Sequence, residues 1–243
     1  MYILLKKTAK KIIPQRVLLK YEFILRKIIS YSYKGKLHKC NICETTLKRF
    51  VELPSNDLLC PACGSLSRTR RLWKLIHEDF MLKGNILDFS PPRCLYINLK
   101  KNQNIRYYAT DFADEFAADY RYDITAIPKE DNFFDFIICY HILEHVEDDA
   151  KAMAELYRVL KPEGICLIQT PFKEGTIYED SSKTTKEERL IAFGQEDHVR
   201  TYSIKGLKKR LENTGFTIEI LYFEEKPKHY YGFINETVLK LIK

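Results

Sequence analysis

Short apolar runs alternate with helix-like stretches over the second half of the chain. The runs are four to seven residues long and mostly apolar, as in strands of a parallel sheet that is covered on both faces. The stretches between them repeat apolar residues at helical spacing. This alternation predicts a Rossmann-like, doubly wound α/β domain. The predicted strands are Ile86–Phe89, Arg106–Thr110, Phe134–Tyr140, Ile165–Thr170 and Thr217–Tyr222, and helices are predicted near 92–102, 147–160 and 203–213.

Two further helical patterns precede this alternation. Apolar residues from Gln15 to about Ser30 fall on one helical stripe with most basic residues off it, and Pro14 interrupts any helix that would run into this one. A second stripe extends from Ser67 to about Leu82. Gly84 then marks a break before the first predicted strand.

These patterns divide the chain into three parts. We expect a basic amphipathic helical arm over 1–39, a small module over 40–66 and the α/β domain over 67–243. Within the domain, the segment at about 172–200 holds many charges and few apolar residues. Connections of that length are usually functional or mobile, so we predict an irregular insertion there.

The positive charge of the chain is concentrated in the arm. The formal net charge is +7, but residues 1–39 contain eleven Lys and Arg and one Glu, so the arm carries +10 and the other 204 residues carry −3. A polyanion such as RNA would therefore contact the arm rather than the whole protein. Three roles stay open for the arm: packing on the rest of the protein, peripheral contact with an anionic membrane surface, and RNA binding.

The sequence carries no targeting or membrane signal that we recognise. No apolar run approaches the roughly 18 residues that span a bilayer, and the N-terminus lacks the uninterrupted apolar stretch and cleavage site of a signal peptide. We therefore expect no transmembrane segment and a cytoplasmic location. In a reducing compartment cysteines serve as metal ligands or small buried side chains rather than as disulfides.

Four of the seven cysteines form two Cys-x-x-Cys pairs. Cys40 pairs with Cys43 and Cys60 with Cys63, and 16 residues separate the pairs. Each such turn lets two thiolates converge on one tetrahedral ion, and Gly64 relieves backbone crowding behind the second pair. The spacing predicts a zinc knuckle or ribbon. Because four sulfur ligands leave no open position, this Zn²⁺ would be structural.

The remaining cysteines and the basic residues near the quartet have different expected roles. Cys139 and Cys166 lie inside apolar runs, so we expect them to be buried in the core. Basic residues around the quartet could offset its negative charge or bind an acidic partner. They are Lys39, Lys48, Arg49, Arg68, Arg70 and Arg71.

Two motifs in the second half resemble a known family. Phe134–Val146 reads FDFIICYHILEHV and Tyr157–Gly164 reads YRVLKPEG. At this distance from each other they are similar to the FDxIxxxxxLEHV and RVLKPGG motifs of class I S-adenosylmethionine (AdoMet)-dependent methyltransferases, in particular the type 11-like set. The resemblance covers about 150 residues from Ile86 onward. It implies a mostly parallel sheet of seven strands and AdoMet as the methyl donor.

The resemblance also implies where AdoMet is held. In the family the first strand ends in an acidic, glycine-rich loop, and here Asp88, Phe89 and Ser90 stand in that place with no glycine. Because glycine permits close backbone approach to a ligand, this departure leaves open a rebuilt site or a domain that no longer binds AdoMet. Asp111, with Phe112 beside it, corresponds to the acid that binds the ribose hydroxyls, and Asp123 and Ile124 correspond to the adenine loop.

The end of the third predicted strand corresponds to the part of the family's site beside the methyl-bearing sulfur. Tyr140 and His141 lie there. Glu144 and His145 follow, and we expect them to support the site or to begin a helix.

A further segment, Phe193–Tyr202, reads FGQEDHVRTY. It resembles an FGQxDHVRxY segment found in a subset of these methyltransferases that share the N-terminal knuckle. One interpretation is a salt-bridged cap of the following helix. The other is a polar cluster facing the substrate, in which His198 is a general base oriented by Asp197 and Arg200 holds an anionic group, with His141 as the competing base.

Together these observations predict an AdoMet-dependent methyltransferase that acts on a small-molecule or glycan-type acceptor. The net negative charge outside the arm favours such an acceptor over a long polyanion. Two alternatives stay open. The protein could be an RNA methyltransferase that uses the basic arm and the zinc module, or a non-catalytic zinc-containing binding protein with a degenerate cofactor loop.

Overall fold

The structure is a computed structural model that describes residues 15–243. The chain divides into two compact units. The N-terminal unit contains the described residues up to Met81 and the segment Phe223–Glu236, and the sheet unit contains Leu82–Tyr222 and Thr237–Lys243. The first fourteen residues, which include part of the predicted basic arm, lie outside the described residues.

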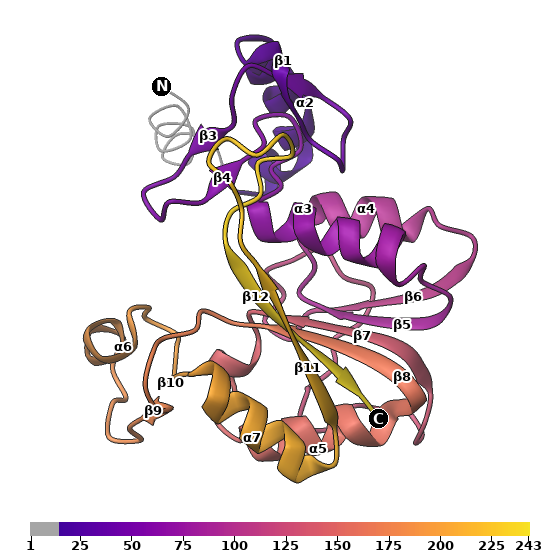
Figure 1. The fold of residues 1–243 in the computed structure, drawn as a ribbon, viewed down its shortest axis with the longest axis vertical. Coiled ribbons are helices and arrows are strands. Elements are labelled where there is room, and N and C mark those ends of the chain that lie inside the picture. The colour runs from indigo at the N-terminus through magenta and orange to yellow at the C-terminus, as the bar shows by residue number, and fades with distance from the viewer. Residues whose placement is uncertain (1–14) are drawn as a thin grey trace. The chain divides into compact units, whose positions relative to one another are not determined.

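The sheet unit is built on six strands in the order β11-β12-β8-β7-β5-β6 (Figure 1). Strands β6, β5, β7 and β8 are parallel to one another, and β12 pairs antiparallel with β8. This arrangement confirms the predicted Rossmann-like fold class. The strands are β5 (Gly84–Phe89), β6 (Ile105–Thr110), β7 (Phe134–Tyr140), β8 (Leu160–Gln169), β11 (Thr217–Phe223) and β12 (Glu236–Ile242).

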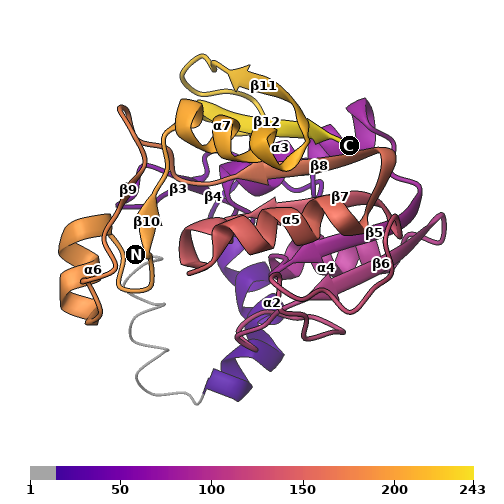
Figure 2. The same ribbon diagram turned by 90° about the horizontal axis from the view of Figure 1, so that it is seen from below.

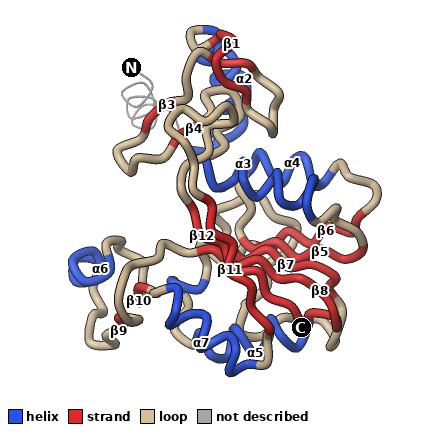
Figure 3. Tube along the Cα trace, in the orientation of Figure 1, coloured by secondary structure: helices blue, strands red, loops and turns tan. Residues whose placement is uncertain are grey.

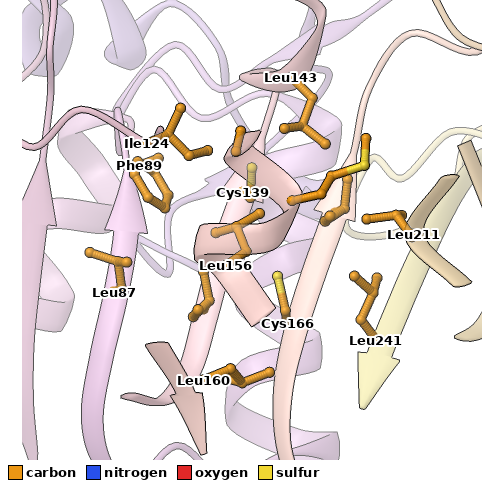
Figure 4. Packing of buried hydrophobic residues seen from close by; sticks show 14 of the residues in the cluster. Leu87, Phe89, Ile124, Cys139, Leu143, Leu156, Leu160, Cys166, Leu211 and Leu241 are labelled. Atoms are coloured by element: carbon orange, nitrogen blue, oxygen red, sulfur yellow. The ribbon is translucent and has the colours of Figure 1, made fainter. Parts of the chain in front are cut away.

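Helices cover both faces of this sheet. Helix α4 (Arg93–Lys100) lies on one face, and α5 (Asp149–Val159) and α7 (Ile204–Thr214) lie on the other, as Figures 1 and 2 show. Residues at α-helical spacing on α5 and α7 meet alternate residues of the strands. The resulting core includes Leu87, Leu156, Leu160, Leu211 and Leu241, all fully buried (Figure 4). Each buried leucine of this kind contributes about 2 kcal/mol through the hydrophobic effect.

Cys139 and Cys166 belong to the same core, as expected from their apolar surroundings (Figure 4). Both thiols are fully buried, and this burial raises the pKa of each well above its ordinary value. They pack as small apolar side chains.

The predicted seventh strand is not found in the described part of the chain. Residues between β6 and β7 run as loops, and only an isolated parallel bridge between Thr110 and Tyr120 continues the sheet beyond β6. Residues 112–115 are exposed and form bends and loop rather than a strand.

The predicted insertion at about 172–200 contains regular structure that the sequence analysis missed. Helix α6 (Lys186–Phe193) begins with a capping box in which Thr185 and Glu188 bond each other's backbone N–H, and it ends at Gly194 in the left-handed conformation. Strands β9 (Tyr178–Glu179) and β10 (Arg200–Thr201), which precede and follow this helix in the chain, pair antiparallel with each other (Figure 3). The Thr-x-x-Glu spacing was a usable signal for this helix.

The N-terminal unit combines helices with two short hairpins. Helix α2 (Gln15–Tyr31) matches the predicted arm helix, and α3 (Ser67–Lys74) continues into a π-helical turn over Leu75–Asp79, where a single helix was expected. Strands β1 and β2 form one two-stranded sheet and β3 and β4 another. They span Lys34–Lys39, Thr46–Leu47, Val51–Glu52 and Leu58–Leu59.

None of the helices in residues 15–243 is both long and apolar enough to cross a lipid bilayer.

Candidate functional site

The four cysteines predicted as zinc ligands lie together in the N-terminal unit. The sulfur atoms of Cys40 and Cys63 are 3.7 Å apart, as are those of Cys43 and Cys60. All four Sγ atoms lie within 4.8 Å of one another. For Zn–S bonds of about 2.3 Å, the corners of a tetrahedron are about 3.8 Å apart. The cluster therefore has the donor set and the spacing that a Zn²⁺ ion requires.

Two turns of the same shape build this cluster. The N–H of Glu44 donates to the carbonyl of Cys40, and the N–H of Gly64 donates to the carbonyl of Cys60, at 2.8 and 2.9 Å. Both Glu44 and Gly64 adopt positive φ, 59° and 80°. Glycine was expected at the second turn, where it costs no strain. The hydroxyl of Ser65 lies 3.2 Å from Cys63 Sγ, so the backbone and a side chain both support the sulfur atoms.

One of the basic residues near the cluster, Arg70, is engaged entirely within the N-terminal unit. Arg70 is fully buried and donates hydrogen bonds to four carbonyl oxygens, those of Ser65, Leu58, Tyr231 and Gly232. Its guanidinium also lies 4.1 Å from the centre of the Phe50 ring. Burial lowers the pKa of Arg70, while the nearby thiols oppose that shift. Arg70 therefore serves the structure of the unit and is not exposed to a partner.

In the sheet unit, the residues predicted to bind AdoMet lie around the carboxyl ends of β5 and β6. Ser90 has a φ of 48°, so it adopts the left-handed conformation that the family's glycine would adopt. Its hydroxyl donates to Asp111 Oδ1 at 2.6 Å. The other oxygen of Asp111 accepts the N–H groups of Glu115 and Phe116 at 2.5 and 2.9 Å. These contacts fix the Asp111 carboxylate at the end of β6.

The two residues before Ser90 are directed elsewhere. Asp88 is 1% exposed and accepts a hydrogen bond of 2.7 Å from the Tyr107 hydroxyl. Burial raises the pKa of Asp88 to about 7, although the Tyr107 hydrogen bond opposes the shift. Phe89 packs in the core. Of the three predicted residues in this loop, Ser90 alone has its polar group turned to Asp111.

The predicted adenine-side residues occupy the loop after β6. Phe112 is 57% exposed, whereas Ile124 is buried in the core. Asp123 Oδ1 accepts hydrogen bonds from the N–H and the hydroxyl of Thr125, both at 2.8 Å. Asp123 thus closes a local turn in the loop between β6 and β7.

A second polar group lies at the carboxyl ends of β7 and β8. His141 directly follows β7, has a φ of 55°, and donates its N–H to the carbonyl of Gln169 at 2.8 Å. Strained, non-glycine residues of this kind are concentrated at functional sites. Among the described residues, no hydrogen-bond partner is found for His141 Nε2, Gln169 Oε1, Thr170 Oγ1 or His198 Nε2, and all four atoms are buried.

Glu144 and His145 lie in a 3₁₀ turn over Leu143–His145, directly after this edge. Glu144 is 1% exposed, and its Oε1 lies 3.1 Å from His141 Nδ1. Burial opposes ionisation of Glu144, but His141 and the local backbone outweigh it and lower the pKa of Glu144. The sequence analysis expected only a supporting role for Glu144 and did not foresee its burial among histidines.

The FGQEDHVRTY segment brings His198 to this turn. The N–H of Val199 donates to the carbonyl of Glu144 at 2.9 Å. The imidazole rings of His145 and His198 lie edge to face, with centroids 4.7 Å apart. Burial lowers the pKa of His198. Asp197 was expected to orient His198, but the structure places its Oδ2 3.3 Å from His145 Nδ1.

Arg200 is almost fully buried, and its guanidinium is engaged within the protein. It donates hydrogen bonds to the carbonyl oxygens of Leu143, Val146 and Glu147, and to the carboxylate of Glu179 at 3.1 Å. These bonds tie the segment to the 3₁₀ turn. This arrangement resembles the salt-bridged alternative for the segment more than an arginine directed at substrate.

Comparisons with known proteins agree with this architecture. A family model described as a methyltransferase domain matches residues 66–220. The chain is 28% identical over 101 residues to a probable S-adenosylmethionine-dependent methyltransferase of Mycolicibacterium smegmatis, covering 40% of this chain and 34% of that protein. It is 40% identical over 58 residues to a ubiquinone/menaquinone biosynthesis C-methyltransferase of Desulfotalea psychrophila, covering 23% of this chain and 24% of that protein. The chain thus matches about a third and a quarter of the lengths of these relatives.

Among solved structures, the fold is similar to that of a SAM-dependent methyltransferase from Archaeoglobus fulgidus. The TM-score is 0.53 at 17% sequence identity, over 72% of this chain and 93% of that chain. At that identity the likeness concerns the fold alone. The family model, in contrast, covers well over half of the 243 residues. The chain therefore belongs to the methyltransferase domain family.

Proposed function

We propose that the protein is an AdoMet-dependent methyltransferase that acts on a small-molecule or glycan-type acceptor. The observation that carries this proposal is the edge formed by the carboxyl ends of β7 and β8, where buried polar atoms of His141, Gln169, Thr170 and His198 lack a partner among the described residues. Burying such atoms is costly unless a ligand bonds them. In doubly wound sheets ligands bind at this edge.

We assign AdoMet to the neighbouring part of the same edge. Asp111 Oδ1 accepts one hydrogen bond from Ser90, and a carboxylate oxygen can accept a second one, which we assign to a ribose hydroxyl. Phe112 and Asp123 would flank the adenine, and Tyr140 and His141 the sulfur. When bound, AdoMet supplies an electrophilic methyl group on its sulfonium sulfur.

The chain's own contribution to methyl transfer is then mainly to hold and orient the acceptor. His141 and His198 are the imidazoles that we propose for taking a proton from the acceptor, each at its buried Nε2. The lowered pKa of His198 keeps this ring neutral near pH 7, so it can accept a proton. We assign Arg200 and Asp197 to positioning, because they contact the 3₁₀ turn and His145.

Calorimetric titration with AdoMet and S-adenosylhomocysteine tests the cofactor assignment. We expect both to bind, and we expect Asp111→Ala to weaken binding by about 1–3 kcal/mol, the usual loss for a charged hydrogen-bond partner. Asp131→Ala is the control, because Asp131 is an exposed carboxylate that precedes β7 at the opposite edge of the sheet. If the folded wild-type protein binds neither ligand, the non-catalytic alternative replaces this proposal.

We also propose that the four-cysteine cluster holds a structural Zn²⁺ ion. Cys60→Ser should lose zinc and solubility, since three thiolates no longer close the tetrahedral shell. Cys94→Ser is the matched control, because Cys94 is buried in α4 and lies outside the cluster. Full zinc occupancy with normal folding in Cys60→Ser would contradict the assignment.

The RNA alternative is supported by the charge of +10 on residues 1–39. RNA binding by the full chain and by a variant lacking these residues should be measured over a range of salt concentrations. Affinity that falls with salt and disappears with the arm would favour RNA as the acceptor class. If the full chain has no measurable affinity at low salt, this alternative is removed.

A further inference from the structure

One cluster of potential metal ligands lies outside the four cysteines. In the described residues, the candidate ligand atoms of Glu144, His145 and His198 all lie within 4.8 Å of one another. They come from two distant segments, the 3₁₀ turn after β7 and the FGQEDHVRTY segment. We propose that these three side chains bind one divalent transition-metal cation at the carboxyl edge of the sheet.

The state of Glu144 is the main argument for a cation. Its side chain is 1% exposed, and its Oε2 has no hydrogen-bond partner among the described residues. The other oxygen, Oε1, lies 3.1 Å from the Nδ1 atom of His141. A buried carboxylate oxygen that lacks a hydrogen-bond partner is destabilising. A cation on these oxygens would remove that cost.

The two imidazoles are prepared for the same role. His145 Nδ1 lies 3.3 Å from Asp197 Oδ2, and a proton held there leaves the Nε2 lone pair for a metal, the usual carboxylate–histidine–metal arrangement. His198 is 3% exposed and its Nε2 has no hydrogen-bond partner in the described chain. The lone pair of this Nε2 is therefore available to a metal ion.

The remainder of the segment holds the two halves of the cluster together. Val199 and Arg200 donate hydrogen bonds to the carbonyl oxygens of Glu144 and Glu147. The Tyr202 hydroxyl donates to Asp149 at 2.6 Å. These bonds fix His198 beside the turn. The motif therefore acts as one structure: Asp197 contacts His145, Arg200 holds the turn, and His198 is positioned as a ligand.

The donor set indicates the class of cation. One carboxylate and two imidazoles suit Mn²⁺, Fe²⁺, Co²⁺ or Zn²⁺, whereas Mg²⁺ and Ca²⁺ prefer oxygen ligands alone. Three protein ligands leave coordination positions open. If the proposed methyl transfer is correct, an acceptor hydroxyl could take one of these positions, where a cation lowers its pKa. That last role rests on the proposed function, and with a cation on His198 it leaves His141 Nε2 as the proton acceptor. Metal binding itself does not rest on the proposed function.

Titration with Mn²⁺ of protein that holds one Zn²⁺ per chain tests the site, because the four thiolates bind that single zinc ion most tightly and Mn²⁺ does not displace it. Loss of the free-ion electron paramagnetic resonance signal reports binding. We expect one Mn²⁺ per chain in the wild type, and affinity lower by at least roughly 10–100-fold in Glu144→Gln and in His198→Gln. His77→Gln, an exposed histidine outside the cluster, should bind like the wild type.

Two results would overturn the proposal: no saturable binding of Mn²⁺ or Co²⁺ by the folded wild type, or unchanged affinity in Glu144→Gln. Should the buried variants fail to fold, spin-echo spectra of wild-type protein with Mn²⁺ must show imidazole nitrogen coupled to the metal, and its absence overturns the site equally. Because AdoMet is left out, failure here leaves the methyltransferase proposal intact. Conversely, failure to bind AdoMet leaves the metal site intact.

Discussion

Ser90 offers a direct test of how this chain replaces the glycine of its family. Two effects act on the residue in opposite directions. Its φ of 48° is unfavourable for any side chain, by about 1–2 kcal/mol. Its hydroxyl, however, donates to the charged Asp111 at 2.6 Å, a bond worth about 1.5–3 kcal/mol. Alanine and glycine at this position separate the two effects.

Ser90→Ala removes the hydrogen bond and keeps the strained backbone. We expect it to lower the free energy of unfolding by about 1.5 kcal/mol, the lower end of the range, because Asp111 keeps two backbone donors. Ser90→Gly loses the same bond but relieves the strain. Glycine's greater freedom in the unfolded chain offsets about 0.4–1 kcal/mol of that relief. The glycine variant should therefore be more stable than the alanine variant by about 0.5–1 kcal/mol.

The measurement is urea unfolding followed by far-ultraviolet circular dichroism, with midpoints compared at a common slope. Ala109→Gly is the control, since Ala109 lies in β6, where glycine should lower stability by about 0.5–1 kcal/mol. A Ser90→Gly variant as unstable as Ser90→Ala, or less stable, would refute the claim that backbone strain is stored at this loop.

Other substitutions test separate parts of the structure. The pKa of Asp88 is raised to about 7, so folding favours its protonated form. The stability that this carboxyl contributes is fully present below its unfolded pKa, near 4. That stability is lost as the pH rises through about 7, by up to about 4 kcal/mol. Asp88→Asn should remove this loss, and a stability difference from wild type that is equal at pH 5 and pH 8 would contradict it. Arg70→Met removes one donor from each of four carbonyl oxygens, of which that of Ser65 keeps the N–H of Cys60. It should cost about 3 kcal/mol, seen as a lower unfolding midpoint and, in protein loaded with zinc, as faster zinc loss to a chelator. Leu156→Ala, in the core of the sheet unit, should cost about 2–5 kcal/mol by calorimetry.

The fold was predictable where local pattern and burial coincide. Parallel strands buried on both faces are nearly continuous apolar runs, so β7 was predicted with its observed bounds, Phe134–Tyr140. Strand β12 (Glu236–Ile242) was missed although its last four residues, Leu239 to Ile242, alternate buried and partly buried positions. It pairs antiparallel with β8. Its place in the sheet depends on that long-range pairing and not on local sequence.

The sequence by itself determined the methyltransferase-type fold and the cysteine quartet, because both rest on residues close together in the chain: strand runs, helical spacing and the Cys-x-x-Cys turns. Only the tertiary structure decided the roles in the FGQEDHVRTY segment. It placed Asp197 beside His145, engaged Arg200 with backbone carbonyls, and brought His198 to the buried Glu144. Such contacts join residues more than fifty positions apart. Their charges and hydrogen bonds depend on burial, which local sequence does not specify.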